Sequence, residues 1–374
     1  MKVVHIITGL GDGGAEHVLF KICKYDITNN HFVISLKGPG KYSELLKKIG
    51  ISVYSLDIGL FSILRFIYLV KLLRSLKPDI VQTWLVHADF LGGIAAKLAG
   101  INNILWNIRY SNIEVSKAKF TTIIIIKILS VLSHRVPKVI ITVSKKAEKI
   151  YEKIGYNKKL FKFIPNGYDL SILKTNKFQK INFKKKNKII KNTTLIGKVA
   201  RYDPQKDHYN LLNALSIIRD KNINFTCILV GSKINRNNVD LVSEIKRLKL
   251  NKHIKLLGQT NNIPELMNGI DLHILSSSYG EGFPNVVAES MACGTPCVVT
   301  NVGDTAFVVG KTGWIVPPNN SIKLAKAIER AIFEKDTIQW KKRCSKAKLR
   351  IKKKFSISKM IRLYNLTWLK IYKK

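Results

Sequence analysis

Acidic residues are scarce in this sequence. It contains 24 aspartates and glutamates against 64 lysines and arginines, so its formal net charge at pH 7 is +40. It also lacks an uninterrupted apolar run of the roughly 18 to 20 residues that a membrane span needs. The nearest approaches are residues 59–73, which include Arg65 and Lys71, and residues 120–132, which include Lys127. We therefore expect amphipathic or buried helices there and no transmembrane segment.

Cysteine is scarce too. The cysteines number five, and they show neither the spacing of a metal site nor the even number of a disulfide set. No charged-then-apolar export signal precedes the first apolar run, residues 3–7. These absences predict a reducing, cytoplasmic environment in which the cysteines near the end of one helix, Cys293 and Cys297, are small core residues.

The positive charge is concentrated in two segments. Residues 174–191 carry eight lysines and residues 341–354 carry nine basic residues, and neither segment contains an acid. An AT-rich coding sequence would explain this, because the chain is rich in Lys, Asn and Ile together. An anionic membrane surface would also explain it, since each basic residue near the headgroups contributes about 1 kcal/mol. Nucleic acid is a third partner for such charge, but no recognition module accompanies it, so we expect no nucleic-acid partner.

Apolar runs alternate with helical patterns along both halves of the chain. At 374 residues and 46% hydrophobic content, the sequence is long enough for two ordinary domains. Strands alternating with helices predict a parallel, doubly wound sheet in each domain. The expected strands are 3–7, 32–36, 53–56, 80–83, 104–108 and 139–143, then 194–200, 225–230, 253–257, 272–275, 296–300 and 313–316. The expected helices of the first half are 16–24, 42–48, 63–76 and 91–98.

The alternation lapses once, in the lysine- and asparagine-rich stretch 174–192. We therefore expect a first domain of residues 1–183, a basic linker of residues 184–192, a second domain of residues 193–354 and a helical tail of residues 355–374. Ligands of such sheets bind beyond the carboxyl ends of the strands. Two facing domains would place their ligands between them.

Residues 276–296 hold the pattern that is richest in chemistry. An apolar run ends in serines and a glycine, Glu281 follows in a loop, and Glu289 lies eight residues later in a helical pattern. Pro284 suits the first turn of that helix, whose free N–H groups and dipole form an anion site. The dipole alone would also favour acids here, but two carboxylates suit a ligand with an anionic middle and hydroxyls at both ends, such as a sugar nucleotide. The residues expected to bind this sugar nucleotide, as the donor of a sugar, between the two glutamates are Gly282, Phe283, Pro284 and Asn285.

This segment resembles the Glu-x7-Glu signature of the retaining GT-B glycosyltransferases, specifically the large family 4 group of nucleotide-sugar-dependent enzymes. Other stretches are similar to the same family in the same order, including GLGDGGAEHVL, FIPNGYD, GKVARYDPQKDHYNLLNAL and GKTGWIVPP. The resemblance implies two Rossmann-like domains facing a central cleft, with the nucleotide sugar held by the second domain. It also implies that the tail crosses back to the first domain and that no cofactor is needed.

A glycine pattern follows the first expected strand. Gly9, Gly11 and Gly14 match the dinucleotide fingerprint Gly-x-Gly-x-x-Gly. That fingerprint requires an acidic residue after the second strand, where this chain has Lys37. The family resemblance instead implies a flexible loop on the acceptor side, whose glycines let the backbone approach a sugar or phosphate closely. The residues expected to line it are Gly13, Gly14 and Glu16.

Two cations follow the first strand of the second half. Arg201 ends that strand and Lys206 lies five residues further on. A solvated basic pair is one interpretation. The other is that both hold the donor diphosphate and neutralise the leaving nucleoside diphosphate as the glycosidic bond breaks. No Asp-x-Asp occurs in the sequence, so we expect cations and a helix dipole in place of a metal, with activity that persists in EDTA.

The remaining candidates lie in three further loops. Gln259 follows a strand at the edge where the family binds the nucleobase. His87 and Asp89, in residues 82–89, are expected on the acceptor side. Arg109, in residues 106–112, stands where many relatives carry a histidine facing the donor sugar; because a guanidinium stays charged, we expect it to bind a hydroxyl or phosphate and not to shuttle protons.

The sequence therefore predicts a cytoplasmic, peripheral glycosyltransferase on the inner face of the plasma membrane. The family resemblance implies that it moves a hexose or N-acetylhexosamine, from a UDP-sugar by preference, to a polyprenyl-linked saccharide of O-antigen or capsule, with retention by a same-face displacement. Three alternatives stay open: a non-hydrolysing nucleotide-sugar epimerase on the same fold, a dinucleotide oxidoreductase, and a binding protein without enzymatic activity.

Overall fold

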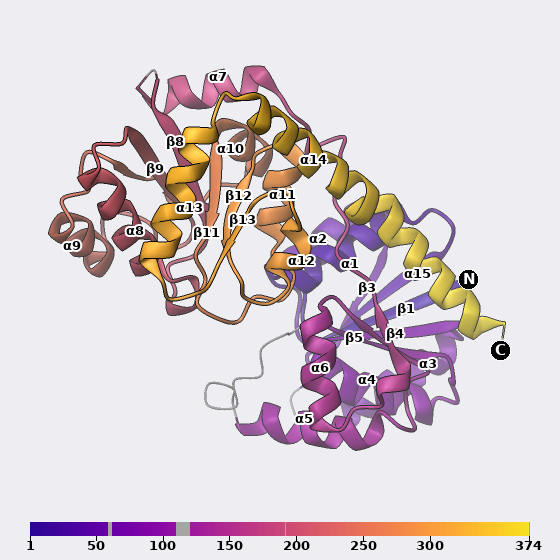
Figure 1. Ribbon diagram of the computed structural model, residues 1–374. Coiled ribbons are helices and arrows are strands. Elements are labelled where there is room, and N and C mark those ends of the chain that lie inside the picture. Colours follow the sequence, from indigo (N-terminus) through magenta and orange to yellow (C-terminus); the bar gives the residue numbers. More distant parts are fainter. Residues whose placement is uncertain (59–61, 110–119, 191, 374) are drawn as a thin grey trace. The chain divides into compact units, whose positions relative to one another are not determined.

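The chain folds into two compact units in a computed structural model (Figure 1). The structure describes residues 1–58, 62–109, 120–190 and 192–373. Unit 1 comprises residues 1–167 together with the tail 357–374, and unit 2 comprises residues 168–356. Residues 110–112, at the end of the segment that contains Arg109, lie outside the described part of the chain.

Unit 1 is built on a seven-stranded sheet whose pairings are all parallel, in the order β3-β2-β1-β4-β5-β6-β7. Its strands are β1 (Lys2–Ile7), β2 (Asn30–Ser35), β3 (Ser52–Ser55), β4 (Ile80–Trp84), β5 (Ile104–Ile108), β6 (Val139–Thr142) and β7 (Phe161–Phe163). Its helices are α1 (Gly14–Tyr25), α2 (Lys41–Lys48), α3 (Ile63–Leu76), α4 (Val86–Leu98), α5 (Phe120–Leu132), α6 (Lys145–Ile154), the short 3-10 helix η1 (Lys158–Leu160) and α15 (Ile357–Tyr372). The reversal of strand order beside β1 is that of a doubly wound, Rossmann-like sheet.

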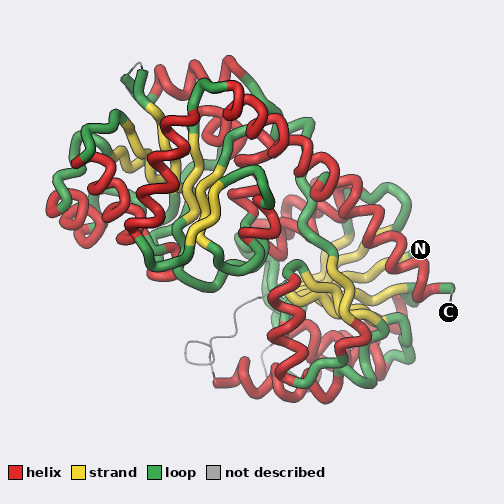
Figure 2. The backbone as a smooth tube through the Cα atoms, in the orientation of Figure 1, coloured by secondary structure: helices red, strands yellow, loops and turns green. Residues whose placement is uncertain are grey.

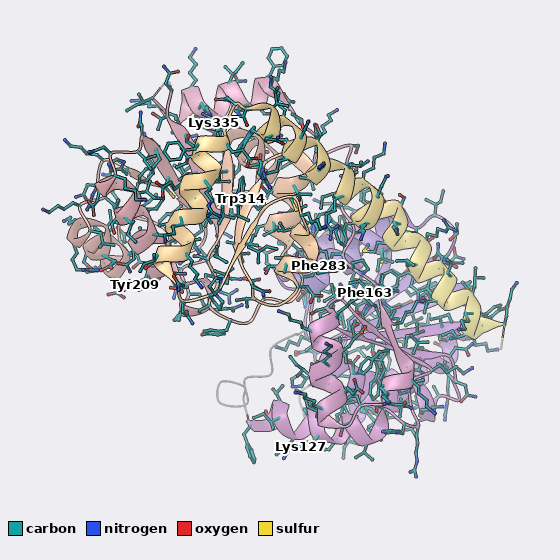
Figure 3. All side chains as sticks on the ribbon, in the orientation of Figure 1. Lys127, Phe163, Tyr209, Phe283, Trp314 and Lys335 are labelled. Carbon is teal, nitrogen blue, oxygen red and sulfur yellow. The ribbon has the colours of Figure 1, made fainter. Side chains whose placement is uncertain are left out.

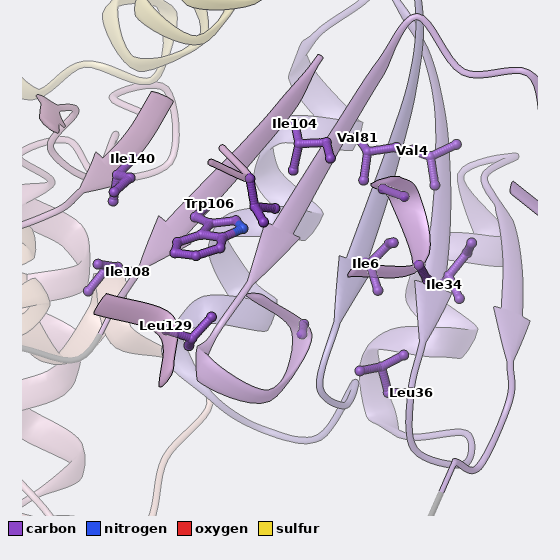
Figure 4. Packing of buried hydrophobic residues seen from close by; sticks show 14 of the residues in the cluster. Val4, Ile6, Ile34, Leu36, Val81, Ile104, Trp106, Ile108, Leu129 and Ile140 are labelled. Atoms are coloured by element: carbon purple, nitrogen blue, oxygen red, sulfur yellow. The ribbon is translucent and has the colours of Figure 1, made fainter. Parts of the chain in front are cut away.

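Both faces of this sheet are covered, as a parallel sheet requires. Successive residues of a strand point to opposite faces, so Val4 and Ile6 pack in one core with Trp106 and helices α3, α4 and α5 (Figure 4). Val3 and Ile7 pack in the other core with α1 and α15. The C-terminal helix thus completes unit 1: Trp368 is fully buried and its indole Nε1 donates to Gln82 Oε1 at 2.8 Å.

Unit 2 has a six-stranded sheet, again with parallel pairings, in the order β10-β9-β8-β11-β12-β13. The strands of both units are yellow in Figure 2. Its strands are β8 (Thr194–Val199), β9 (Phe225–Val230), β10 (Ile254–Leu256), β11 (Leu272–Leu275), β12 (Cys297–Thr300) and β13 (Trp314–Val316). Its helices are α7 (Lys177–Lys186), η2 (Pro204–Lys206, 3-10), α8 (His208–Asp220), α9 (Val239–Arg247), α10 (Ile263–Gly269), α11 (Asn285–Cys293), α12 (Thr305–Val309), α13 (Ser321–Glu334) and α14 (Ile338–Phe355). The expected pair of doubly wound domains is confirmed.

The boundary between the units differs from the one expected. Unit 1 ends at Gly167 and not at residue 183. The stretch expected to contain the linker 184–192 belongs to unit 2, because α7 packs against α10 and buries Phe183. Lys180 and Lys184 both bind the buried carboxylate of Asp271. The lysine-rich stretch therefore contains a helix, and the Asp271 carboxylate partly neutralises its charge.

The second basic segment is helical as well. Nine basic residues of 341–354 lie on α14, which packs on α11 through a stripe that includes Ala347 and Ile351. The tail begins at Ile357, in α15. No helix in the described ranges is both long and apolar enough to cross a membrane.

Candidate active site

The loop after β8 positions the two cations of unit 2. Asp203 caps η2 by accepting from the backbone N–H of Gln205 at 2.9 Å. Asp207 adopts a left-handed backbone (φ 46°) and caps α8 by accepting from the N–H of Asn210 at 3.0 Å. These two caps fix the tight turn that carries Lys206 between them.

Lys206 forms an ion pair with Glu281. Lys206 Nζ lies 2.6 Å from Glu281 Oε1, and Ser277 Oγ donates to the same oxygen at 2.6 Å. The Glu281 carboxylate is buried, with 9% of its side chain exposed. Lys206 follows β8 and Glu281 follows β11, and these strands are neighbours in the sheet. Two residues 75 apart in sequence therefore meet at the carboxyl edge of unit 2.

Two glycines make room for the loop that carries Glu281. Gly280 has φ 72°, and a Cβ there would lie 2.8 Å from Gln205 Nε2. Gly303 has φ 55°, and a Cβ there would lie 1.7 Å from the carbonyl oxygen of Glu281. Larger residues would be strained at both positions, so the loop is held between the η2 turn and the turn at residue 303.

Arg201 lies on the same turn as Lys206 and is more exposed. Its Nε lies 3.1 Å from Asp203 Oδ2, its side chain is 56% exposed, and its guanidinium also donates to Gln205 Oε1 at 3.3 Å. The carboxylate that caps η2 thus also holds Arg201. The edge of unit 2 presents two cations and one buried carboxylate, an arrangement suited to a diphosphate with neighbouring hydroxyls.

Helix α11 begins one residue later than expected. Pro284 is its N-cap, with an extended backbone (φ −77°, ψ 91°), and Asn285 is the first helical residue. Asn285 Oδ1 accepts from the hydroxyl of Tyr168 at 2.6 Å. Phe283 is buried, stacked on Tyr168 and in edge contact with Phe355. Phe283 therefore anchors the loop through an aromatic cluster, and its contact with the donor stays a prediction.

The other donor candidates occupy different parts of unit 2. Gly282 is partly exposed, and its carbonyl accepts from the N–H of Asp304 at 3.1 Å. Glu289 lies half-buried on α11, within its nine residues. Gln259 is exposed after β10, where it lines a pocket of about 200 Å³ with Val230, Thr260 and Asn262.

The glycine loop of unit 1 lies at the carboxyl end of β1. Gly13 is the N-cap of α1 and Gly14 its first residue. The Glu16 side chain folds back over Gly13, so that a Cβ there would lie 2.3 Å from Glu16 Oε2. His87 lies at the start of α4 and is half-buried; burial, and then the nearby Lys37, lower its pKa, so its ring is neutral at neutral pH.

Asp89 lies inside unit 1 and differs from the surface group expected for an acceptor site. It is 3% exposed and accepts from Thr83 Oγ1 at 2.5 Å. Burial raises its pKa to about 7. Its carboxyl therefore joins α4 to β4 and has no surface left for a saccharide.

Arg109 is also used internally. Its guanidinium donates to Asn166 Oδ1 at 2.6 Å and to the hydroxyl of Tyr364 at 2.6 Å, and it lies 4.9 Å from the ring centroid of Trp84. Because Tyr364 belongs to α15, Arg109 helps to fasten the C-terminal helix. Its contact with the donor stays a prediction.

A buried chain of polar side chains lies under α15 and was not expected from the sequence. Trp84 Nε1 donates to His5 Nδ1 at 3.2 Å, so His5 Nε2 donates to His31 Nδ1 at 3.0 Å, and His31 Nε2 donates to Asp26 Oδ2 at 3.1 Å. His5, His31 and Cys23 also lie close enough together to hold a metal ion. Each imidazole nitrogen already has a protein partner, however, so the donor set fits a hydrogen-bond chain. These residues are far apart in sequence, and their spacing matches no motif from which the chain could have been predicted.

Comparison with known proteins agrees with this architecture. Residues 12–172 match the model of Glycosyltransferase Family 4, and residues 179–350 match the model of Glycosyl transferases group 1. The Anabaena protein HepE, solved in complex with UDP and glucose, superposes with a TM-score of 0.83 at 25% identity over 98% of this chain and 99% of that one.

Two curated bacterial proteins are similar over most of their length. The UDP-Gal:alpha-D-GlcNAc-diphosphoundecaprenol alpha-1,3-galactosyltransferase of Escherichia coli is 28% identical over 72% of this chain and 70% of its own. The capsular polysaccharide biosynthesis glycosyltransferase CapM of Staphylococcus aureus is 27% identical over 74% of this chain and 73% of its own. The two family models together cover nearly all of the sequence, and the fold agrees with the match. This chain therefore belongs to the family 4 glycosyltransferases of the GT-B fold.

Proposed function

We propose that this glycosyltransferase transfers a hexose or N-acetylhexosamine from a UDP-sugar to a saccharide carried on a polyprenyl diphosphate, in the assembly of O-antigen or capsule. The names of the relatives support each part. The Escherichia coli protein uses UDP-Gal and a diphosphoundecaprenol-linked sugar, the Staphylococcus aureus protein makes capsule, and the Anabaena structure contains UDP and glucose.

The observation that carries the proposal is the Lys206–Glu281 pair. An ion pair of 2.6 Å at the carboxyl edge, beside Arg201 and the N-terminus of α11, gathers positive charge where a diphosphate can bind. In the reaction, Lys206 and Arg201 would stabilise the negative charge that develops on the leaving diphosphate. Glu281 would hold Lys206 in place and accept from a hydroxyl of the sugar.

The layout of unit 2 also suits the length of a nucleoside diphosphate. Arg201 follows β8 and Gln259 follows β10, and only β9 lies between these strands. Their ends are therefore roughly 10 Å apart, about twice the spacing of neighbouring strands. A base at the pocket near Gln259 would leave the diphosphate at Arg201 and Lys206, and the sugar at Glu281.

Retention and independence of metal belong to the same proposal. The family resemblance implies a same-face displacement in which the leaving diphosphate takes the acceptor's proton. The two cations and the dipole of α11 would supply the charge that a divalent ion supplies elsewhere. Anomeric protons in the NMR spectrum of the product test the first point, and turnover in EDTA tests the second. An inverted product, or activity restored only by Mg²⁺, would overturn the respective claim.

We further propose that unit 1 lies on an anionic membrane surface, the inner face of the plasma membrane. Helices α3 and α5 both pack against α4 and carry no acidic residue. Each exposes both large apolar side chains, such as Leu64 (81%) and Phe120 (77%), and cations, such as Lys71 and Lys127. Figure 3 labels Lys127 on α5. Apolar groups next to basic ones suit the boundary of headgroups and acyl chains.

Vesicle co-sedimentation tests the membrane proposal. Binding should rise with the fraction of phosphatidylglycerol, fall with salt, and weaken severalfold in a Leu64→Ser, Phe120→Ser double variant. Ile322→Ser, at an exposed apolar position in unit 2, is the matched control. Equal binding to neutral and anionic vesicles would refute this part.

A panel of UDP-, GDP- and ADP-sugars tests the central proposal. One nucleotide should raise the melting temperature by several degrees, since a ligand that binds only the folded state stabilises it. The same nucleotide sugar should be hydrolysed slowly when no acceptor is present. No stabilisation by any of them would contradict the assignment.

A further inference from the structure

Lys198 lies directly beneath the cations of the proposed site, inside the sheet. It is a residue of β8, and only 2% of it is exposed. Its Nζ donates to the backbone carbonyl of Lys206 and to Ser276 Oγ, both at 2.5 Å. Nothing in the sequence indicates a role for this lysine, since it stands within an apolar run expected to be a strand.

The ammonium group joins the two segments that carry the ion pair. Ser276 Oγ, which accepts from Lys198, itself donates to the carbonyl oxygen of Asp207 at 2.7 Å. Ser276 immediately follows β11 and leads into the loop of Ser277 and Glu281. One buried amine therefore connects the η2 turn, with Lys206, to the loop that holds Glu281.

The hydrogen-bond acceptors of this buried amine are neutral. They are a carbonyl and a hydroxyl, and among the described residues no carboxylate is in ion-pair contact with it. Burying an ammonium group without a paired carboxylate favours its neutral form. Burial, and next the positive charge of Lys206, lower the pKa of Lys198 to about 7.

Three other ionisable groups around Lys198 keep their charge state near neutral pH. Burial lowers the pKa of His208, on α8, to about 2 and that of His273, on β11, to about 3. Burial raises the pKa of Cys227, on β9, to about 12. The charged neighbours are Lys206 on η2, Asp207 before α8 and Glu281 in the loop after β11. Burial raises the pKa of Asp207. Among the strongly shifted groups of this cluster, Lys198 is the one whose pKa lies near 7.

We propose that Lys198 is a third cation of the diphosphate site, a positioning residue that takes up a proton when the donor's diphosphate binds to Lys206 and Arg201. The inference rests on the proposed function, which brings the diphosphate to this edge. Two negative phosphates above the buried amine supply the counter-charge that its own contacts lack. The charged form is then favoured, and it strengthens the hydrogen bonds that hold Lys206 and the Glu281 loop.

The direction of the pH dependence follows from linkage. The anion raises the pKa of Lys198 above its value in the free protein, so binding is strongest below that free value and weakens as pH rises through it. The number of protons taken up on ligand binding should be small at pH 6, where the amine of the free protein is already protonated. It should approach one proton at pH 8. Affinity should fall by about tenfold over the same range.

Isothermal titration calorimetry with UDP-glucose tests the proposal. Its two phosphates are esterified and do not titrate near neutral pH, so the ligand itself takes up no proton. Titrations in two buffers of different ionisation enthalpy, at pH 6, 7 and 8, give the number of protons bound. The test variant is Lys198→Met, which keeps the length of the side chain. The control variant is Lys255→Met, because the ammonium group of Lys255 also donates to backbone carbonyls of unit 2. Thermal unfolding checks that both variants fold.

We expect rising uptake in the wild type and in Lys255→Met, and none in Lys198→Met. Binding of UDP-glucose by the wild type without uptake at pH 8 would overturn the role of Lys198 while leaving the donor site intact, and this reading does not depend on how the variant folds. Uptake that persists in Lys198→Met would overturn it too. Failure of UDP-glucose, UDP and GDP-mannose to bind the wild type at all would instead refute the proposed function on which the inference rests.

Discussion

In unit 2, the polar residues that follow the strands bind one another at the edge of the sheet, whereas in unit 1 they bind the interior. Lys206 and Glu281 pair beside the exposed Arg201. Asp89 and Arg109 occupy comparable positions in unit 1, after β4 and β5, yet their partners are Thr83, Asn166 and Tyr364. A polar residue at a strand's carboxyl end can therefore serve either a ligand or the fold, and its partners decide which.

The largest loss of stability that we expect from this contrast follows from a change in the C-terminal helix. Trp368→Ala should destabilise unit 1 by about 3 to 5 kcal/mol, because a fully buried indole is lost and Gln82 loses its partner. Hydrogen exchange of β1 and α15, read separately from unit 2, measures this. Leu366→Ala, at a half-exposed position of the same helix, is the control and should cost little. Equal protection in both variants would mean that α15 does not hold unit 1 together.

The ion pair of unit 2 should behave in the opposite way. Lys206→Ala and Glu281→Ala should each lower kcat by about 100-fold or more, as when a transition-state contact is removed, with a smaller loss of stability. The Lys221–Glu329 pair of the same unit, at 2.7 Å, provides matched controls in Lys221→Ala and Glu329→Ala. Losses under threefold for both site variants would remove Lys206 and Glu281 from the mechanism.

Asp89 predicts a smaller, pH-dependent effect in unit 1. Burial raises its pKa from 3.8 to about 7, so the folded state binds a proton that the unfolded state has released. The stability that this proton confers is complete below about pH 4 and is lost as pH rises through about 7, by at most ~1.4 kcal/mol per pH unit.

Asp89→Asn should flatten that dependence, because an amide still accepts from Thr83 and cannot ionise. Denaturant unfolding of unit 1 between pH 5 and pH 8 measures the slope in both proteins. Equal slopes in the two proteins would show that Asp89 is already charged in the folded chain. Any pH dependence of the stability of unit 1 would then come from another group.

The fold could be predicted because its strands are buried on both faces. Such strands read as continuous apolar runs, and Ile104–Ile108, Phe225–Val230 and Leu272–Leu275 have the bounds expected of them. Helix α7 was missed because its lysines resemble a solvated linker, while the Asp271 carboxylate that binds two of them lies far away in sequence. Strand β7, of three residues, is too short to show a period.

The sequence indicated the residue types of the candidate site but not the contacts between them. Arg201, Lys206 and Glu281 stand out because they follow strands. Their pairing depends on β8 and β11 being neighbours, which strand order decides and spacing does not show. Lys198 could not be found from the sequence, since one lysine inside a strand gives no sign of which way its amine points or what surrounds it.

The position of α15 has a consequence for the order in which the chain is made. Unit 2 is an insertion between residue 167 and residue 357 of unit 1. A ribosome therefore releases every residue of unit 2 before the helix that closes unit 1 is complete. Domains fold as units during synthesis, so unit 2 can finish while the β1 face of unit 1, with His5 and Trp84, still lacks its cover. A stop codon near residue 356 would leave unit 2 complete and unit 1 with an open core. We expect chaperones and proteases to act first on that open core.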